Sequence, residues 1–147
     1  MSRIETRSIL EVWEKSLKNH GYRVTRPRLQ IMEIIASSNT PLTPQEIYQS
    51  TLKLVDPPGI ASVYRSLEML DALGLIQQIH HPGGCHRIWP AFEGHQHFLI
   101  CKDCGHVRVI EGSDQMAGYI SSIEDKTGYQ VVDHWLQFFG LCEGCVK

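Results

Sequence analysis

Four of the five cysteines form two Cys-x-x-Cys pairs, Cys101–Cys104 and Cys142–Cys145. Turn-forming residues stand inside each pair, so each pair can present two thiolates to one side of a metal ion. Two such pairs complete a tetrahedral four-cysteine site of the kind that binds structural zinc. The spacer between the pairs is longer than the roughly 15–20 residues of a simple zinc ribbon. Because the spacer has room for a helix and a strand, zinc would join the two ends of a small domain.

The same four cysteines could instead form two disulfides. The sequence shows no signal peptide and no apolar run long enough to cross a membrane, which predicts a cytoplasmic protein. Cytosolic thiols stay reduced, so we predict one structural zinc ion per chain. Four thiolates leave no open position on the metal, and the paired motifs of zinc deaminases are absent from the sequence. We therefore do not expect an enzyme.

A second group of ligand-type residues begins at His80. A loop over residues 81–84 would place His80 and Cys85 opposite each other across a hairpin, with Cβ atoms ~4.5–5.5 Å apart. Imidazole, thiolate and carboxylate together suit zinc, whereas iron(II) sites more often lack sulfur. Taken singly, a cysteine is more often a small buried apolar residue and a histidine in an apolar strand more often belongs to the core. Their grouping favours metal binding for the set His80, Cys85, His95, His97, Glu111 and His134.

The elements that must position these residues begin with a series of helices. Apolar residues at helical spacing form a first segment that Gly21 ends. Thr25 can cap a second helix, which has Pro27 in its first turn. Residues 43–46, Thr-Pro-Gln-Glu, form a capping box for a third helix. The Asp-Pro-Pro-Gly sequence at 56–59 breaks the chain before a fourth.

The fourth helix, about residues 60–73, has an apolar stripe on one face and mainly small or polar residues on the other. Residues 75–80 and 85–89 follow as the strands of a hairpin. This order is typical of a winged helix-turn-helix domain, in which the helix before the hairpin enters the DNA major groove. The alternative is a small helical domain whose arginine is simply solvated. The stripe comprises Ile60, Val63, Leu67 and Leu70, and the opposite face comprises Ala61, Ser62, Arg65 and Met69, with Tyr64 on the flank.

The composition of the chain changes near residue 90. The first 79 residues hold nine Lys and Arg against eight Asp and Glu, and the remainder holds five against eight. DNA binding must therefore come from a local cluster and not from bulk charge.

The second part of the chain predicts a small α/β unit. Strand patterns cover residues 98–100 and 107–110, a helical stripe starts at Met116 and ends near Gly128, and residues 129–139 form a final strand pattern. We predict an α+β fold, with a winged-helix domain, a connector and an α/β domain closed by the four-cysteine zinc site. The three segments are residues 1–89, 90–97 and 98–147.

These residues resemble the ferric uptake regulator family of metal-dependent repressors over about residues 21–145. The resemblance rests on Arg26-Pro27-Arg28, Ser62-Val63-Tyr64-Arg65, His95-x-His97 and the two cysteine pairs. It implies an N-terminal winged helix and a C-terminal α/β dimerisation domain, and hence a homodimer that binds pseudo-palindromic operator DNA. The DNA-contacting residues that it implies are Arg26, Arg28, Ser62, Tyr64 and Arg65.

Within the family, the chain most resembles the zinc uptake regulator branch, because Cys85 stands where that branch has a wing cysteine. This resemblance implies a regulatory zinc ion besides the structural one, and repression of zinc uptake genes. The iron and peroxide branches commonly use a histidine near the second helix, and this chain has none between His20 and His80. An iron-responsive repressor and a zinc-thiolate redox switch are the alternatives. The implied sensing ligands are His80 or His81, Cys85, His95 or His97, and Glu111, and a further site would add His97 and His134.

Overall fold

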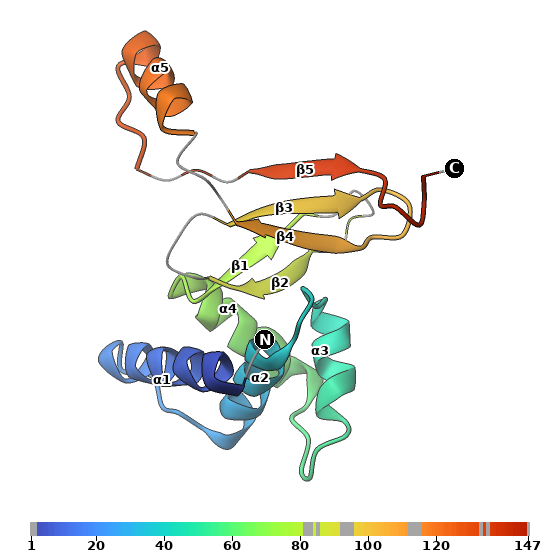
Figure 1. Ribbon diagram of the computed structural model, residues 1–147. Coiled ribbons are helices and arrows are strands. Elements are labelled where there is room, and N and C mark those ends of the chain that lie inside the picture. Colours follow the sequence, from blue (N-terminus) through green and yellow to red (C-terminus); the bar gives the residue numbers. More distant parts are fainter. Residues whose placement is uncertain are drawn as a thin grey trace. The chain divides into compact units, whose positions relative to one another are not determined.

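The computed structural model (Figure 1) describes residues 3–80, 84, 86–91, 96–111, 116–132, 134 and 136–146. For residues 3–5, 96 and 111 it describes the backbone alone. The chain divides into two compact units, Met1–Ala91 and Phe92–Lys147. Both contain helices or strands in the predicted order, which confirms the α+β class. Within the described residues, we find no helix with the length and apolar character needed to cross a bilayer.

The first unit consists of helices followed by a two-stranded antiparallel hairpin. Proline occupies the first turn of both α2 and α3, where its missing N–H costs no helical hydrogen bond. The last helix gives way to the hairpin at Gly74, whose φ of 65° is left-handed and therefore favours glycine. The elements are α1 (Arg3–Asn19), α2 (Arg26–Ser37), α3 (Pro44–Thr51), α4 (Ile60–Ala72), β1 (Ile76–Ile79) and β2 (Arg87–Pro90).

One apolar core holds these elements together. Trp13 and Leu17 of α1 are buried where α1 packs on α2. Helix α4 contacts α2, α3 and β1, and its Val63 and Leu70 are fully buried. Each such side chain contributes about 1.5–3 kcal/mol on burial, which holds α4 with Tyr64 facing out. The core comprises Trp13, Leu17, Ile31, Met32, Ile35, Ile47, Val63, Leu67, Met69, Leu70, Ile76 and Ile88.

The predicted faces of α4 need two corrections. Ile60 is 43% exposed instead of buried, because it stands in the first turn of the helix and not among the core residues. Met69 is buried instead of exposed. Neighbours on several sides widen the buried face of this helix beyond a single stripe.

The hairpin is tied to the start of α3. Leu42 and Ile88 exchange two backbone hydrogen bonds, at 3.1 and 2.6 Å. The Arg87 guanidinium donates to the Pro41 carbonyl at 3.0 Å and to a Glu46 carboxylate oxygen at 3.3 Å. That same oxygen of Glu46 accepts from the backbone N–H of Thr43 in the predicted capping box. Strand β2, through Arg87, and the N-terminal cap of α3 therefore share the Glu46 carboxylate.

The register of the hairpin differs from the prediction. Ile79 pairs with Arg87, so the next position places His80 opposite His86, and the two ring centroids are 4.6 Å apart. The prediction that His80 faces Cys85 was wrong by one residue. Strand β2 begins at Arg87 because Ile88 must point into the core beside Ile76, and this requirement sets the register.

The second unit is a three-stranded sheet with one helix. Strand β3 (Gln96–Cys101) lies in the middle, antiparallel to β4 (Val107–Glu111) and parallel to β5 (Gln137–Gly140). Helix α5 (Ala117–Thr127) lies between β4 and β5 in sequence. Phe98, Ile100 and Val107 of the sheet are buried, whereas α5 contributes no buried residue.

The final strand is shorter than the predicted 129–139. Gly128 ends α5 with a φ of 72°, and the backbone N–H of Val131 then donates to the Glu124 carboxylate at 2.8 Å. The chain after α5 thus turns back along the helix and joins the sheet only at Gln137. The Glu124 side chain therefore accepts a hydrogen bond from a backbone N–H that strand pairing would otherwise have used.

We expect Thr43→Ala to destabilise the protein by about 1 kcal/mol, because the hydroxyl oxygen of Thr43 accepts from the backbone N–H of Glu46 at 3.1 Å. Urea unfolding of the purified protein measures this. Thr40→Ala, at an exposed threonine just before the cap, is the matched control and should change the free energy of unfolding little. Equal effects of the two substitutions would contradict a capping role for Thr43.

Candidate metal centres and nucleic-acid interface

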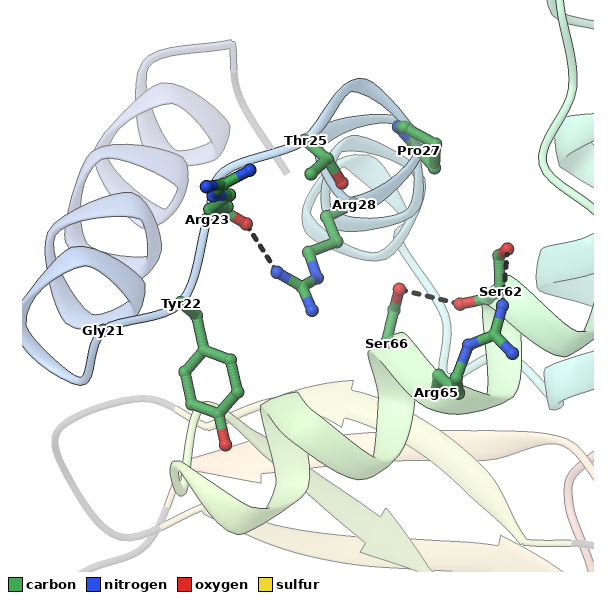
Figure 2. Close-up of a pocket in the computed structure, with 9 residues that line it drawn as sticks. All are labelled: Gly21, Tyr22, Arg23, Thr25, Pro27, Arg28, Ser62, Arg65 and Ser66. Atoms are coloured by element: carbon green, nitrogen blue, oxygen red, sulfur yellow. Dashed lines mark hydrogen bonds between the residues drawn. The ribbon is translucent and has the colours of Figure 1, made fainter.

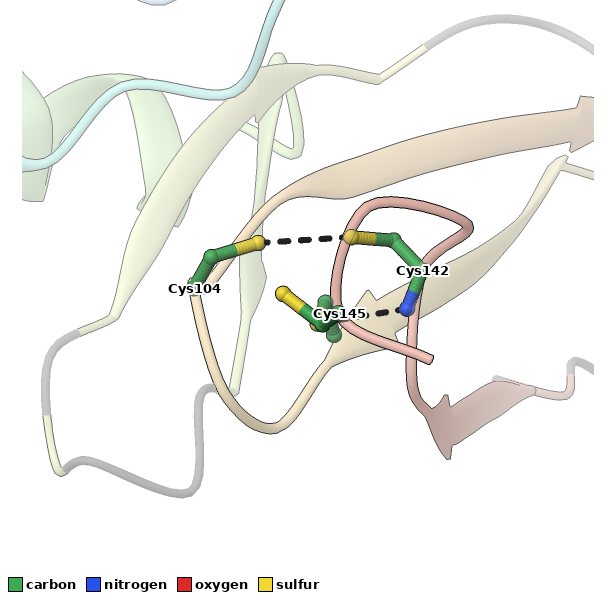
Figure 3. Close-up of side chains that lie close together, drawn as sticks. Cys104, Cys142 and Cys145 are labelled. Atoms are coloured by element: carbon green, nitrogen blue, oxygen red, sulfur yellow. Dashed lines mark hydrogen bonds between the residues drawn. The ribbon is translucent and has the colours of Figure 1, made fainter. Parts of the chain in front are cut away.

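The four predicted zinc ligands Cys101, Cys104, Cys142 and Cys145 lie together, with their sulfur atoms all within 4.8 Å of one another. Figure 3 shows Cys104, Cys142 and Cys145 from the two loops turned toward one another. The Sγ atoms of Cys104 and Cys142 are 3.6 Å apart. A tetrahedral zinc ion with Zn–S bonds of ~2.3 Å needs sulfur atoms about 3.8 Å apart. The residues present therefore fit a four-cysteine zinc site.

Parallel pairing of β3 and β5 explains how residues so far apart in sequence meet. Cys101 ends β3 and is paired with Gly140, which ends β5 two residues before Cys142. Since the strands are parallel, both cysteine pairs leave the sheet at the same end. Backbone hydrogen bonds then close the two turns, from Gly105 N–H to the Cys101 carbonyl at 3.0 Å and from Cys145 N–H to the Cys142 carbonyl at 2.8 Å.

The thiols of the cluster differ in pKa. The pKa of Cys101 is lowered to about 6, chiefly because the backbone N–H of Cys104, and next that of Cys142, hydrogen-bond to its sulfur. The pKa of Cys145 is raised to about 12, chiefly because the neighbouring sulfur of Cys142, followed by that of Cys104, stabilises its protonated form. At neutral pH, Cys101 is a ready thiolate and Cys145 is a thiol.

Two further ligand candidates come together in the second unit. His97 of β3 is buried, and its ring centroid lies 5.7 Å from that of His134. Within the described residues, the buried Nδ1 atom of His97 has no hydrogen-bond partner. A buried imidazole nitrogen without a hydrogen-bond partner can bind a metal ion in place of one.

The remaining sensing candidates are placed only in part. His80 is exposed beside β1. Cys85, His95 and the alternative His81 lie outside the described residues, and of Glu111 only the backbone is described, paired with Gln96 next to His95.

The structure adds His86, which the sequence analysis did not include. His86 is exposed and its ring meets that of His80 edge to face across the hairpin. The sequence allows this pairing, because five residues separate His80 from His86 and loops of five residues close hairpins as readily as loops of four.

The predicted DNA-contacting residues differ in where the structure places them. Tyr64 and Arg65 project from the outer face of α4, with Tyr64 46% exposed. Arg26 instead turns away, since its guanidinium donates to the Val55 carbonyl at 3.2 Å and lies 3.8 Å from the Asp56 carboxylate. Arg28, Ser62 and also Arg65 line a cavity of about 510 Å³ between the start of α2 and α4 (Figure 2). Tyr22 and Arg23, which the sequence analysis passed over, line the same cavity.

Known proteins resemble this chain over almost its whole length. The model of the ferric uptake regulator family matches residues 19–139. The ferric uptake regulation protein of Legionella pneumophila is 31% identical over 134 residues, which are 89% of this chain and 96% of that protein.

Solved structures agree in fold. The ferric uptake regulator of Helicobacter pylori, described as having three functional metal-binding sites, is 26% identical with a TM-score of 0.81, over 99% of this chain and 97% of its own. A zinc uptake regulator complexed with zinc and DNA covers 95% of this chain and 94% of its own with a TM-score of 0.63. At 18% identity it shows the shared fold alone.

We expect zinc binding by the cysteine cluster to release protons at neutral pH, because Cys145 is a thiol without metal and binds metal as a thiolate. Zinc affinity should then fall as the pH falls, since protons compete for the same sulfur atoms. Titration of the protein with zinc in weak buffer containing a pH indicator measures the release. Cys145→Ser should release fewer protons, and an unchanged release would mean that Cys145 is not a ligand.

Proposed function

The chain belongs to the ferric uptake regulator family, and we propose that it is a cytoplasmic, zinc-responsive repressor that binds operator DNA as a homodimer. Members of this family are metal-responsive transcription regulators and not enzymes. The proposal therefore concerns which metal is sensed and which residues carry out sensing and binding. The observation that carries it is a thiol in the sequence, Cys85, which directly precedes His86, the residue whose ring meets that of His80 across the hairpin. Sulfur beside imidazole favours zinc over iron(II).

One zinc ion per chain has a structural role in this proposal. Cys101, Cys104, Cys142 and Cys145 close a tetrahedron with no open position, so this ion joins the ends of β3 and β5 and takes no part in sensing. A unit of this size has a small core, which a metal can stabilise.

At least one further zinc ion acts as the signal. The proposed ligands are His80, Cys85, His95 and Glu111, with His81 and His97 as alternatives at two of the positions. His86 joins this group because it is the cross-strand neighbour of His80. An additional site would use His97 and His134, whose rings are close together, and would compete for His95 and Glu111. The Helicobacter pylori regulator, with its three functional metal-binding sites, offers a precedent for such a count.

The proposed ligands belong to both units, which suggests how sensing reaches DNA. His80 and Cys85 stand in the first unit and Glu111 stands in the second. Ligands that share one ion would restrain the orientation of the winged helix relative to the dimer. A dimer must present two recognition helices ~34–36 Å apart, and an orientation set beforehand lowers the cost of binding. A ~100-fold gain in affinity needs only about 2.7 kcal/mol of coupling.

Exposed apolar residues of the second unit support the homodimer. Leu99 and Phe138 are paired neighbours on β3 and β5, and both are more than 40% exposed. Such residues on one chain are typical of a surface that is buried in an assembly. The exposed set comprises Leu99, Ile110, Tyr119, Tyr129, Val132, Phe138, Phe139, Leu141 and Val146.

An iron-responsive repressor is the second candidate, because the Legionella pneumophila relative is named a ferric uptake regulation protein. A redox switch that releases zinc when the four clustered thiolates are oxidised is the third. The metal or oxidant that changes DNA affinity separates these functions.

We expect two classes of zinc site in a competitive titration against a calibrated chelator, with DNA binding followed at each free zinc concentration. The tight class should persist through mild chelation, and the weaker class should switch DNA binding. Parallel titrations with iron(II) and peroxide test the two alternatives. A single tight class, with DNA affinity indifferent to zinc, would exclude zinc sensing.

We expect Cys85→Ser and His86→Ala to weaken zinc-dependent DNA binding while leaving folding and the tight zinc ion intact, because both residues lie outside the four-cysteine cluster. DNA binding against free zinc gives the shift for each variant. His20→Ala removes an exposed histidine of the first unit that belongs to no proposed site, and it should match the unaltered protein. If His86→Ala also matches, His86 is not a sensing ligand.

A further inference from the structure

We propose that Arg87 is a positioning residue, which carries the effect of the regulatory zinc ion from the wing, the β1–β2 hairpin, to the helices of the first unit. Its partners are the Pro41 carbonyl and the Glu46 carboxylate, and we call these three groups the latch. This inference rests on the proposed zinc-responsive function. It adds the route inside the first unit by which zinc changes DNA affinity.

Arg87 ties the first residue of β2 to the start of α3. Its Nη1 atom donates to the Pro41 carbonyl at 3.0 Å and to Glu46 Oε2 at 3.3 Å. Pro41 lies between α2 and α3, and Glu46 stands in the first turn of α3. Of the ion pairs found among the described residues, this is the one that includes a residue of the wing.

The latch lies directly beside the proposed zinc ligands of the wing. His86 precedes Arg87 in the chain, and Ile79, the cross-strand partner of Arg87, precedes His80. The rings of the two histidines are 4.6 Å apart. Each histidine is therefore one residue away from the strand pair that Arg87 fixes. A metal ion that draws the two rings into coordination acts first on this end of the hairpin.

Partial burial makes the latch stronger than an ordinary surface ion pair. The side chains of Arg87 and Glu46 are 24% and 49% exposed, whereas those of the Arg7–Glu11 pair on α1 are 83% and 68% exposed. Exposed pairs contribute little to stability, while hydrogen bonds that involve charged groups contribute more. The Arg7–Glu11 pair is therefore a matched control for the latch.

The shared carboxylate extends the latch into α3. Glu46 Oε2 also accepts from the backbone N–H of Thr43 at 2.7 Å, which closes the cap of the helix. A displacement of the Arg87 guanidinium therefore acts on the same oxygen atom that starts α3. Helix α3 contacts α4, and Ile47 of α3 belongs to the same core as Val63 of α4. The positions of β2, α3 and α4 are in this way connected.

Backbone contacts keep the fold intact without the latch. Leu42 and Ile88 exchange two backbone hydrogen bonds at 3.1 and 2.6 Å, and Ile88 is buried in the core. These contacts lie one residue further from His86 than Arg87 does. Loss of the Arg87 side chain should therefore release the ligand end of β2 while the rest of the strand stays in place.

This arrangement gives Arg87 a role in coupling. A zinc ion held by both units restrains the wing, and the restraint changes DNA affinity only as far as the wing and α4 move together. Strand β1 continues from α4 through Gly74, so the chain itself connects it. Strand β2, which follows His86, depends on contacts across space, and the latch is the contact at its first residue.

The test compares the full chain with the regulatory zinc ion bound and after mild chelation. Its DNA is a fluorescent duplex selected by the zinc-loaded protein from a random-sequence pool. The measured quantity is the ratio of the two dissociation constants, which is the gain in DNA affinity due to zinc. We expect Arg87→Gln and Glu46→Gln each to lower this gain about tenfold, the equivalent of one charge-assisted hydrogen bond. Arg7→Gln should keep the gain of the unaltered protein.

The two substitutions exclude simpler explanations of a shared effect. Glutamine in place of Glu46 can still close the capping box, so the start of α3 is retained. Arg87→Gln and Glu46→Gln change the net charge in opposite directions, so bulk charge cannot lower the gain in both. The double variant should lose no more than either single variant, because both single variants break the same interaction.

Zinc binding supplies a second readout that a purely structural role would not change. By linkage, DNA must raise the affinity for the regulatory zinc ion by the same factor by which zinc raises the affinity for DNA. Competitive zinc titrations with and without the duplex measure that factor. It should fall about tenfold in both latch variants, while zinc affinity without DNA stays that of the unaltered protein. A residue that only stabilises the fold would lower the free energy of unfolding in urea and leave both ratios unchanged.

The outcomes separate this inference from the function on which it rests. If zinc does not change the DNA affinity of the unaltered protein, both fall. If zinc does change it, and Arg87→Gln and Glu46→Gln respond as Arg7→Gln does, the latch is overturned and the zinc-responsive function stands. Additive losses in the double variant would also overturn a shared latch. If Arg87→Gln does not fold, Glu46→Gln decides the question alone.

Discussion

The parallel pairing of β3 with β5 is the constraint on which the second unit depends. It brings residues 101 and 140 to the same end of one sheet, and only this arrangement lets two short turns point four thiols at one another. A metal ion held by this cluster would compensate for a small core, to which α5 contributes no buried residue. Apolar residues that a larger domain would cover stay at the surface, where a second chain can bury them.

In the first unit, packing against neighbouring elements fixes the orientation of helix α4 and leaves one of its faces exposed. The core grips α4 from several sides, and the Glu46 carboxylate joins the wing strand to the start of α3 through Arg87. Functional residues then sit at the margins of this core, with Tyr64 on one edge of α4 and the arginine-lined cavity at another. His80 follows the last residue of β1 and His86 precedes the first residue of β2, so both histidines lie one position beyond the paired strands.

Local signals in the sequence were sufficient wherever neighbouring residues decide the outcome. The Thr43–Glu46 capping box, the proline starts of α2 and α3, and Gly74 all act within one turn of chain, and the structure has them as predicted. Predictions failed where a distant partner decided. Met69 is buried by packing from several elements, and the chain after α5 turns back because Glu124 binds Val131. The hairpin register followed Ile88 and the core, not the shortest loop between two ligand-type residues.

The sequence by itself predicted the cysteine cluster, because two cysteine pairs at turn spacing are a local pattern, and the structure brings the four thiols together in an arrangement that fits zinc. It also determined the order of helices and hairpin, and with it the family. Only the tertiary structure decided which of several similar side chains are free to contact a ligand. Arg26 and Arg28 stand two residues apart in one motif, yet packing directs Arg26 onto Asp56 and Arg28 into the cavity beside α4. The direction of a side chain depends on the partners that folding brings to it, and those partners are distant in the sequence.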